Sequence, residues 1–92
     1  MSIMIEIPSA LTKYTNSQDE IQVEASTVGE AFEKLVSQYQ DLKQHLYEEN
    51  GNIRSFINVY LNDEDIRYAD NLNTKAESGD SIQIVPSIAG GM

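Results

Sequence analysis

The sequence predicts an α+β fold, in which a mixed β-sheet carries one long helix packed on one face. Two patterns predict this fold. Several short segments alternate apolar and polar residues, as half-buried strands do, and one longer segment repeats apolar residues at helical spacing. A single amphipathic helix among strands must bury its apolar stripe against the sheet. With 92 residues, the chain is expected to form one domain over residues 1–86, followed by a flexible tail over residues 87–92.

The first two strands are predicted to form a hairpin with a long connection. Segment 3–7 places three isoleucines on one face of the first strand, a period-two pattern rich in β-branched residues. Pro8 ends this strand, because proline cannot donate to the hydrogen-bond ladder. Residues 12–20 are polar and are expected to form a turn, and residues 21–24 then alternate apolar and polar in the second strand.

One long amphipathic helix follows, of about five turns at 3.6 residues per turn. Thr27 and Glu30 fit a capping box, in which the Thr27 hydroxyl accepts from the amide of residue 30 and the Glu30 carboxylate reaches back. Asn50 and Gly51 supply the left-handed conformation at which helices often end. The apolar positions at helical spacing are Val28, Ala31, Phe32, Leu35, Val36, Tyr39, Leu42 and Leu46.

Three further strands are expected in the second half of the chain. Segment 56–61 is the first of them, the acidic segment 62–65 is a turn, and residues 66–68 form a short return strand. A polar stretch with Leu72 as an inward anchor then leads to the last strand at 81–85. The strand residues expected to face the helix are Ile3, Ile5, Ile7, Ile57, Val59, Leu61, Ile82 and Ile84.

Composition excludes several classes of function. The chain contains no cysteine, so disulfides, thiolate metal sites and cysteine nucleophiles are excluded. Six Lys and Arg against fifteen Asp and Glu give a net charge of −9. This charge argues against nucleic acid and anionic membrane as partners, because both are bound through clustered positive charge. It suits a protein partner with a basic surface, although acidity also serves solubility alone. Without an export segment or a bilayer-spanning apolar run, we expect a cytoplasmic protein.

No catalytic or metal site of the chain's own is predicted. His45 is the one histidine, and the sequence places no partner beside it, so a solvated helix residue is expected. The run Asp63-Glu64-Asp65 lacks the glycine and terminal glutamate of an EF-hand loop and is expected to be a turn. No serine stands in a Gly-x-Ser-x-Gly elbow. We therefore expect no bound cofactor and no metal.

Two glycines follow the last predicted strand near the end of the chain, which reads Pro86-Ser87-Ile88-Ala89-Gly90-Gly91-Met92. Glycine has no Cβ, so a tail that contains it can thread a narrow channel and bring a backbone carboxyl group close to the catalytic atoms of another protein. Fully extended, residues 87–92 reach about 20 Å. The pattern indicates that the reactive group is the chain's own carboxylate.

Three stretches carry a resemblance to a known family: FINVYLNDEDIR at 56–67, GDSIQIVP at 79–86 and IAGG at 88–91. Together with the order of strands and helix over the whole chain, they resemble the ubiquitin-like sulfur carriers of the MoaD/ThiS family. Within it they are most similar to the CysO-like carriers of thiocarboxylate-dependent cysteine biosynthesis. The resemblance implies a β-grasp fold, in which the first and last strands are central and parallel neighbours.

The resemblance implies that Gly91 is the site of adenylation and of the thiocarboxylate, and that Gly90 gives the tail clearance. In such carriers an E1-like adenylyltransferase/sulfurtransferase of the MoeB/ThiF type uses ATP to activate the terminal glycine. A sulfide donor then converts the acyl-adenylate into a thiocarboxylate. A PLP-dependent cysteine synthase would receive the sulfide, for cysteine, homocysteine or a related product. Ile88 and Ala89 would be the part of the tail that contacts a partner.

Met4, Tyr60 and Val85 are expected on the face of the sheet away from the helix, as apolar candidates for docking. The competing interpretation is scattered surface apolarity, because exposed apolar side chains are common on folded proteins.

Met92 departs from the family pattern, since members that act directly end in glycine. The resemblance implies a precursor, in which a JAMM-type zinc metallopeptidase cleaves the bond between Gly91 and Met92 before Gly91 can be adenylated. Three alternatives stay open. The chain could be the small subunit of a molybdopterin synthase, a ubiquitin-like modifier joined through Gly91 to target lysines, or an interaction module with a flexible tail.

Overall fold

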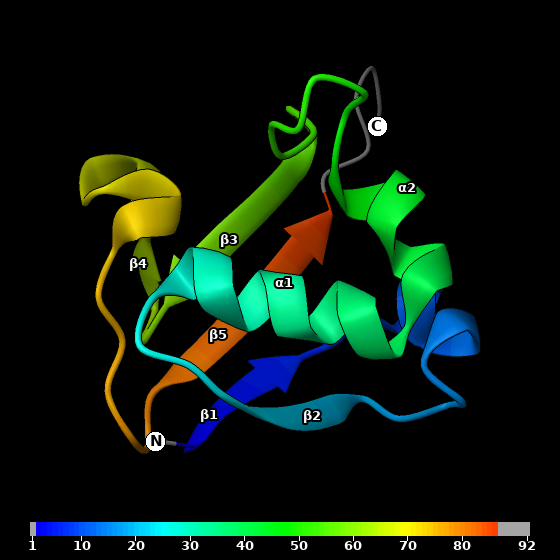
Figure 1. Cartoon of the computed structure of the whole chain (residues 1–92), viewed down its shortest axis with the longest axis horizontal. Coiled ribbons are helices and arrows are strands. Elements are labelled where there is room, and N and C mark those ends of the chain that lie inside the picture. Colours follow the sequence, from blue (N-terminus) through cyan, green and yellow to red (C-terminus); the bar gives the residue numbers. More distant parts are fainter. Residues whose placement is uncertain (1, 87–92) are drawn as a thin grey trace.

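The computed structural model describes residues 2–86, and residues 1 and 87–92 lie outside the described part. A mixed sheet in the order β2-β1-β5-β3-β4 is crossed on one face by helix α1 (Figure 1). The strands are β1 (Ser2–Glu6), β2 (Glu20–Glu24), β3 (Ile57–Leu61), β4 (Glu64–Asp65) and β5 (Ser81–Pro86). The helices are α1 (Val28–Gln38) and α2 (Lys43–Leu46), and the 3₁₀ turns are η1 (Ser9–Tyr14), η2 (Gln40–Leu42), η3 (Ile66–Tyr68) and η4 (Asn71–Asn73).

The first and last strands are parallel neighbours at the centre of the sheet, which confirms the predicted arrangement. β1 pairs with β5 in parallel, with Ile5 opposite Ile82. A parallel pair needs a long crossover, and here α1 and the outer strand pair β3–β4 lie between β1 and β5 in the chain (Figure 1). Beyond Gln83, β5 continues to Pro86 paired with β3. The last strand is therefore anchored deep in the sheet before the chain leaves it.

The hydrophobic core lies between the sheet and α1. Of the strand residues predicted to face the helix, all are buried except Leu61, which is half-buried against the same core. From the helix, Phe32 and Leu35 are completely buried. Burying one such side chain stabilises the fold by about 1.5–3 kcal/mol, so this apolar stripe holds α1 on the sheet. None of the described helices is long and apolar enough to cross a membrane.

Helix α1 begins with the predicted capping box in a slightly altered form. The Glu30 amide donates to Thr27 Oγ1 at 3.1 Å. The Glu30 carboxylate reaches back to Ser26 rather than to Thr27, accepting from the Ser26 amide at 2.7 Å and from its hydroxyl at 3.0 Å. These hydrogen bonds from Ser26 lower the pKa of Glu30. The first turn of α1 is thus closed from two successive residues.

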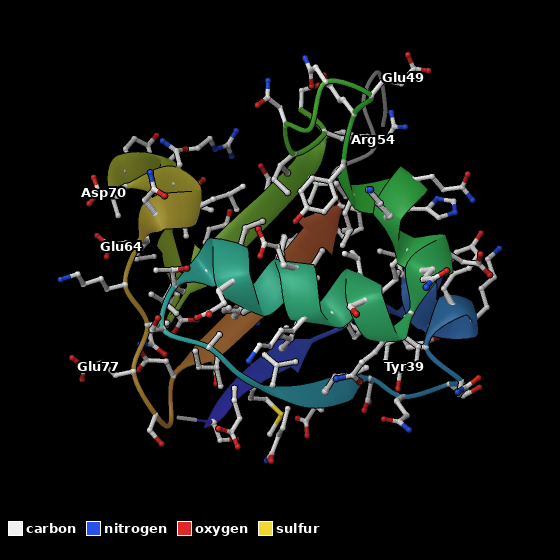
Figure 2. The ribbon with its side chains drawn as sticks, viewed as in Figure 1. Tyr39, Glu49, Arg54, Glu64, Asp70 and Glu77 are labelled. Carbon is white, nitrogen blue, oxygen red and sulfur yellow. The ribbon has the colours of Figure 1, made fainter. Side chains whose placement is uncertain are left out.

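The predicted long helix is interrupted after Gln38. Tyr39 leaves the helical conformation with φ −129° and ψ 80°, and the chain turns away through η2 and α2 at the point that Figure 2 labels Tyr39. Leu42 and Leu46 are completely buried, so both serve the core as predicted, but from a separate element. A helix unbroken from residue 28 to 46 would be about 28 Å long. Because five strands span only about 19 Å and a five-residue strand about 17 Å, such a helix would carry its last leucines beyond the sheet.

Residues 66–68 form the turn η3 rather than the predicted short strand. The return strand is β4, joined to β3 through Asn62 and Asp63, whose φ angles are 51° and 72°. Two successive positive φ angles are typical of a type I′ hairpin. Asp65 then accepts the Arg67 amide at 2.9 Å. This cap satisfies a donor that a strand would have paired, so the chain bends away from β3.

Two other turns differ in extent from the sequence prediction. Residues 9–14 form η1, which begins before the polar stretch that was expected to turn. Gly51 has φ 91°, but it lies in a turn closed by its own amide donating to the Glu48 carbonyl at 2.9 Å. It does not end a helix, because α2 has already ended at Leu46.

Candidate functional site

The candidate site is the C-terminal end of β5, from which the predicted tail continues. Pro86 is the last residue described and lies opposite Ile57, the first residue of β3. The predicted tail 87–92 lies outside the described residues. That segment holds the residues predicted to react, to give clearance, to contact partners or to be removed, namely Gly91, Gly90, Ile88, Ala89 and Met92. The structure therefore describes the strand end that precedes the predicted tail.

A polar network determines where β5 begins. Gly79 has φ 92°, a conformation that glycine adopts without strain. The Asp80 carboxylate accepts from the Glu77 amide at 2.7 Å and from Asn62 Nδ2 at 3.0 Å. These hydrogen bonds lower the pKa of Asp80. Asn62 Oδ1 in turn accepts from the Ser81 amide at 3.0 Å. Because the start of β5 is set in this way, the register of β5, and with it the position of its far end, is also set.

The loop that precedes β3 is fastened beside the end of β5. Arg54 donates its amide to the Leu46 carbonyl at 2.9 Å and its Nε to the Gln44 carbonyl at 2.8 Å. The Arg54 carbonyl accepts from the Ile57 amide at 3.0 Å, so Arg54 connects α2 to the strand residue opposite Pro86. Figure 2 shows Arg54 in the loop near the end of β5, with Glu49 farther out along the same loop.

Tyr47 also contacts the loop that precedes β3. It forms an isolated antiparallel bridge with Ile53. Burial, and to a lesser degree the charge of Glu33, raise the pKa of Tyr47 to about 12. The phenol is therefore neutral at physiological pH and acts as a packing residue of this loop.

The three predicted docking residues all lie on the face of the sheet opposite α1, since each directly follows a buried residue of its strand, namely Ile3, Val59 or Ile84. Met4 and Tyr60 are half-buried, and Val85 is 39% exposed. Each lies opposite a polar residue of the adjacent strand, which is Ser81, Gln83 and Asn58 respectively. The face is therefore mixed rather than one continuous apolar patch, and its role in docking stays a prediction.

Phe56 is an apolar surface residue that the sequence reasoning did not single out. It directly precedes Ile57 and is 36% exposed, and Val85 directly precedes Pro86. Both therefore flank the pair at which the described chain ends. The signal was available, because two adjacent apolar residues at the start of a strand cannot both face the core. Phe56 and Val85 place exposed apolar surface at the strand end from which the predicted tail continues.

The other residues considered as candidates, His45 and the acidic run 63–65, make structural contacts. His45 stacks on Tyr14, with ring centroids 4.4 Å apart, and so joins α2 to η1. In the predicted acidic turn, Asp65 is paired with Arg67 at 2.9 Å. Among residues 2–86, no group of three or more His, Cys, Asp or Glu side chains could hold a metal ion.

A pocket of about 290 Å³ lies between β3 and the turns η3 and η4. Its apolar wall consists of Ile53, Ile57, Val59, Ile66 and Leu72. The one carboxylate in the wall, that of Asp65, is already paired with Arg67. Of the residues that line the pocket, Ile57 is the one that pairs with Pro86, the last residue of β5, so we assign the site to the strand end and not to this pocket.

Comparisons with known proteins find one family and relatives named as sulfur carriers. A family model described as the ThiS family matches residues 5–91. The chain is 32% identical over 93 residues to the sulfur carrier protein CysO of Mycobacterium tuberculosis, covering 99% of this chain and all of the relative. It is 36% identical over 94 residues to a putative sulfur carrier protein of Archaeoglobus fulgidus, with 99% and 100% covered.

Among solved structures, the chain is similar to one in the BexX/CysO complex of Amycolatopsis orientalis. The TM-score is 0.88 at 32% identity, with 97% of this chain and 99% of the other covered. This likeness confirms the predicted β-grasp fold, with its mixed sheet and the helix packed on one face.

Proposed function

Because this chain belongs to the ThiS family, we propose that it is a CysO-like sulfur carrier whose reactive group is the carboxylate of Gly91 after removal of Met92. The observation that carries the proposal is the extent of the family match. It runs over residues 5–91 and ends at the second glycine. Relatives named as sulfur carriers, similar to this chain over nearly their whole length, support the same assignment.

For adenylation and sulfur loading, the chain contributes only its own carboxyl group. A carboxylate is a poor electrophile, and its oxygen becomes a leaving group when it attacks the α-phosphate of ATP and releases pyrophosphate. Sulfide then attacks the acyl carbon, AMP departs, and a thiocarboxylate remains. Its charge lies largely on a polarisable sulfur, which can act as a nucleophile toward an acceptor. Adenylation and sulfur transfer would be performed by an E1-like MoeB/ThiF-type enzyme that uses ATP and a sulfide donor.

Further steps would also belong to partner enzymes. A JAMM-type zinc metallopeptidase would hydrolyse the peptide bond between Gly91 and Met92 and expose the Gly91 carboxylate. A PLP-dependent synthase would receive the sulfide in the formation of cysteine, homocysteine or a related product. The complex of BexX with CysO supports the expectation that a carrier of this kind works while bound to another protein.

The described structure supports a division of labour between domain and tail. β5 is anchored by pairing on both sides and by the Asp80 network, so its end has a defined position. From there, residues 87–92 can reach about 20 Å when extended, which suits a deep active site. Phe56 and Val85 at the base of the tail, with Met4 and Tyr60 on the same sheet, would contact the rim of that site.

Intact-mass measurement tests the proposal. The full chain and a chain ending at Gly91 are each incubated anaerobically with the activating enzyme of the same organism, ATP and sulfide. We expect the chain that ends at Gly91 to gain the mass of one oxygen-to-sulfur exchange, and the full chain to remain unchanged until the metallopeptidase is added. A chain ending at Gly90 is the matched control and should not react.

Each alternative predicts a different observation. Loading of the full chain as fast as the shortened one would refute the requirement for Met92 removal. Adducts on target lysines without a thiocarboxylate would favour a protein modifier. A stable complex with a molybdopterin synthase large subunit would favour the molybdopterin pathway. No reaction of any form would leave an interaction module.

A further inference from the structure

Arg67 is held in a defined position on the turn η3. Its Nε donates to both carboxylate oxygens of Asp65, at 3.2 and 3.3 Å, and its Nη2 donates to Asp65 Oδ2 at 2.9 Å. Nη2 also donates to Asn58 Oδ1 in β3. The hydrogen bonds from Arg67 lower the pKa of Asp65. The side chain of Arg67 nevertheless remains 55% exposed, so part of an oriented guanidinium group faces solvent.

These contacts tie the guanidinium group to Asn58 and Asp65, two side chains of the face of the sheet opposite α1, at the edge of β3 where Arg67 also lines the pocket described above. Asn58 alternates with the buried Ile57 and Val59, so its side chain points to that face. Asn58 of β3 lies opposite Val85 of β5, and Asp65 of β4 lies opposite Tyr60 of β3. Arg67 is therefore bonded to the strand neighbours of two of the residues proposed to dock on partner enzymes.

The charge around Arg67 is of the opposite sign. Among the residues of the described strands and of η3, Arg67 is the one basic side chain. The carboxylates of the strands are Glu6, Glu20, Glu24, Glu64 and Asp65. The three carboxylates of β1 and β2 lie toward the opposite edge of the sheet from Arg67, whereas Glu64 and Asp65 lie in β4 beside it, and Asp65 is paired with it. Figure 2 shows Glu64 and Asp70 on the flank of β4 and its neighbouring turns.

A partner that matched only the net charge of −9 would meet a misplaced cation at this point. The pattern instead fits a surface that is basic over β1 and β2 and presents a carboxylate over β3. An arginine held in advance by an internal partner loses little conformational freedom on binding. Charge patterns of this kind determine the register of two surfaces and exclude wrong partners.

We propose that Arg67 binds a carboxylate of the activating enzyme, and that this contact sets the orientation in which the carrier docks. The inference rests on the proposed function, because it takes the adenylating enzyme as the partner. It assigns to Arg67 a positioning role in the delivery of the tail, and the chemistry at Gly91 does not involve it.

A purely structural role makes different predictions. If Arg67 served only to hold η3 against β3, then removing Asp65 or removing Arg67 would break the same contact with the same result. If only net charge mattered, removing any exposed cation would make the chain more negative and strengthen its binding to a basic surface. The exposed Lys34 on α1 allows this to be tested, because Lys34→Gln changes the charge by the same amount away from the sheet.

The experiment is equilibrium binding of the full chain to the purified activating enzyme by calorimetry, with three variants: Arg67→Gln, Asp65→Asn and Lys34→Gln. We expect Arg67→Gln to raise the Kd by about 10- to 100-fold, the range for losing a hydrogen bond between charged groups. Lys34→Gln should leave the Kd unchanged or lower it. Asp65→Asn, which keeps the cation, should stay within about threefold of the parent chain, the scale of an exposed charge pair.

Adenylation kinetics separate docking from chemistry. With variants shortened to end at Gly91, Arg67→Gln should raise the KM for the carrier and leave kcat unchanged. Equal effects of Arg67→Gln and Asp65→Asn, or an Arg67→Gln variant that binds as tightly as the parent chain, would overturn this inference and leave the proposed function intact. A parent chain that does not bind the enzyme, and that is not adenylated when shortened to end at Gly91, would overturn the proposed function and this inference with it.

Discussion

Replacing Gly29 by alanine should destabilise the fold, although alanine is the better helix former. In an open helix the exchange would gain about 1 kcal/mol. At Gly29, however, the new Cβ would lie 2.9 Å from the carbonyl oxygen of Leu72 and 3.2 Å from its Cβ. The oxygen belongs to the backbone of η4, which is closed by the Asn73 amide donating to the Asp70 carbonyl at 2.9 Å. The turn therefore cannot yield by rotating a side chain.

The cost of overpacking is about 1–3 kcal/mol, so we expect a net loss of about 1 kcal/mol. For a domain of this size that corresponds to a Tm lower by about 4–8 °C. The assay is thermal unfolding followed by circular dichroism. Gly51 provides the contrast, because a Cβ there meets nothing within 4 Å but φ is +91°.

Gly51→Ala should therefore also lower the Tm, through backbone strain, and Gly51→Asn should recover part of the loss because asparagine tolerates positive φ. At Gly29, asparagine should be worse than alanine, since the larger side chain adds to the contact with Leu72. A Gly29→Ala variant with a raised Tm would refute the reasoning, because it would show that η4 moves aside at no cost.

Three further measurements follow from the structure. Thr27→Ala should lower the free energy of unfolding in urea by about 1 kcal/mol, because the Glu30 amide loses its acceptor. Thr27→Ser should keep most of the stability. Equal losses in the two variants would contradict the role of Thr27 as a cap. The pKa of Tyr47 is raised from 10.0 to about 12, so the folded chain gains stability that is complete below pH 10 and is lost as the pH rises toward 12. Tyr47→Phe should abolish that part of the pH dependence, and an unchanged profile would count against it. Phe56 is 36% exposed, and covering that surface on docking is worth about a third of a full burial. Phe56→Ala should weaken binding to the activating enzyme by about two- to sixfold, with Phe56→Leu close to the parent chain, whereas equal affinity of all three would remove Phe56 from the interface.

The parts of the fold that follow from side-chain periodicity could be predicted from the sequence. The isoleucines of β1 and β5 are buried as expected, and so is the apolar stripe of α1 except for Val36, which is half-buried against the core. A period of two or of 3.6 residues directly reports which face meets the core. The parallel pairing of β1 with β5 needed the family resemblance, since alternation does not specify which strands are neighbours.

The break at Tyr39 could not be read from the pattern. Leu35, Leu42 and Leu46 keep helical spacing and are all completely buried, so periodicity is the same for one long helix and for two short ones. The break depends on the size of the sheet beneath, a property of the assembled domain. The strand expected at residues 66–68 failed for a local reason, since Asp65 caps the Arg67 amide and the preceding β4 had already completed the hairpin.

The candidate site divides in the same way. Glycines and a terminal carboxylate are visible as residues, so the tail could be proposed from the sequence. The Asp65–Arg67–Asn58 contact could not, because it joins three elements whose relative placement depends on the hairpin turn and on η3. Phe56 lay between these cases, since its exposure follows from alternation once the start of β3 is known.

The parallel pairing of β1 and β5 also has a mechanical consequence. β1 begins at one end of the central pair, and β5 ends at the other (Figure 1). A pull between the beginning of β1 and the end of β5 therefore runs along both strands and loads the hydrogen bonds between them together, in shear. Such a ladder resists force far better than one opened bond by bond. A chain immobilised through its first residues should thus withstand traction applied beyond the end of β5, and single-molecule pulling between these two points would measure that resistance.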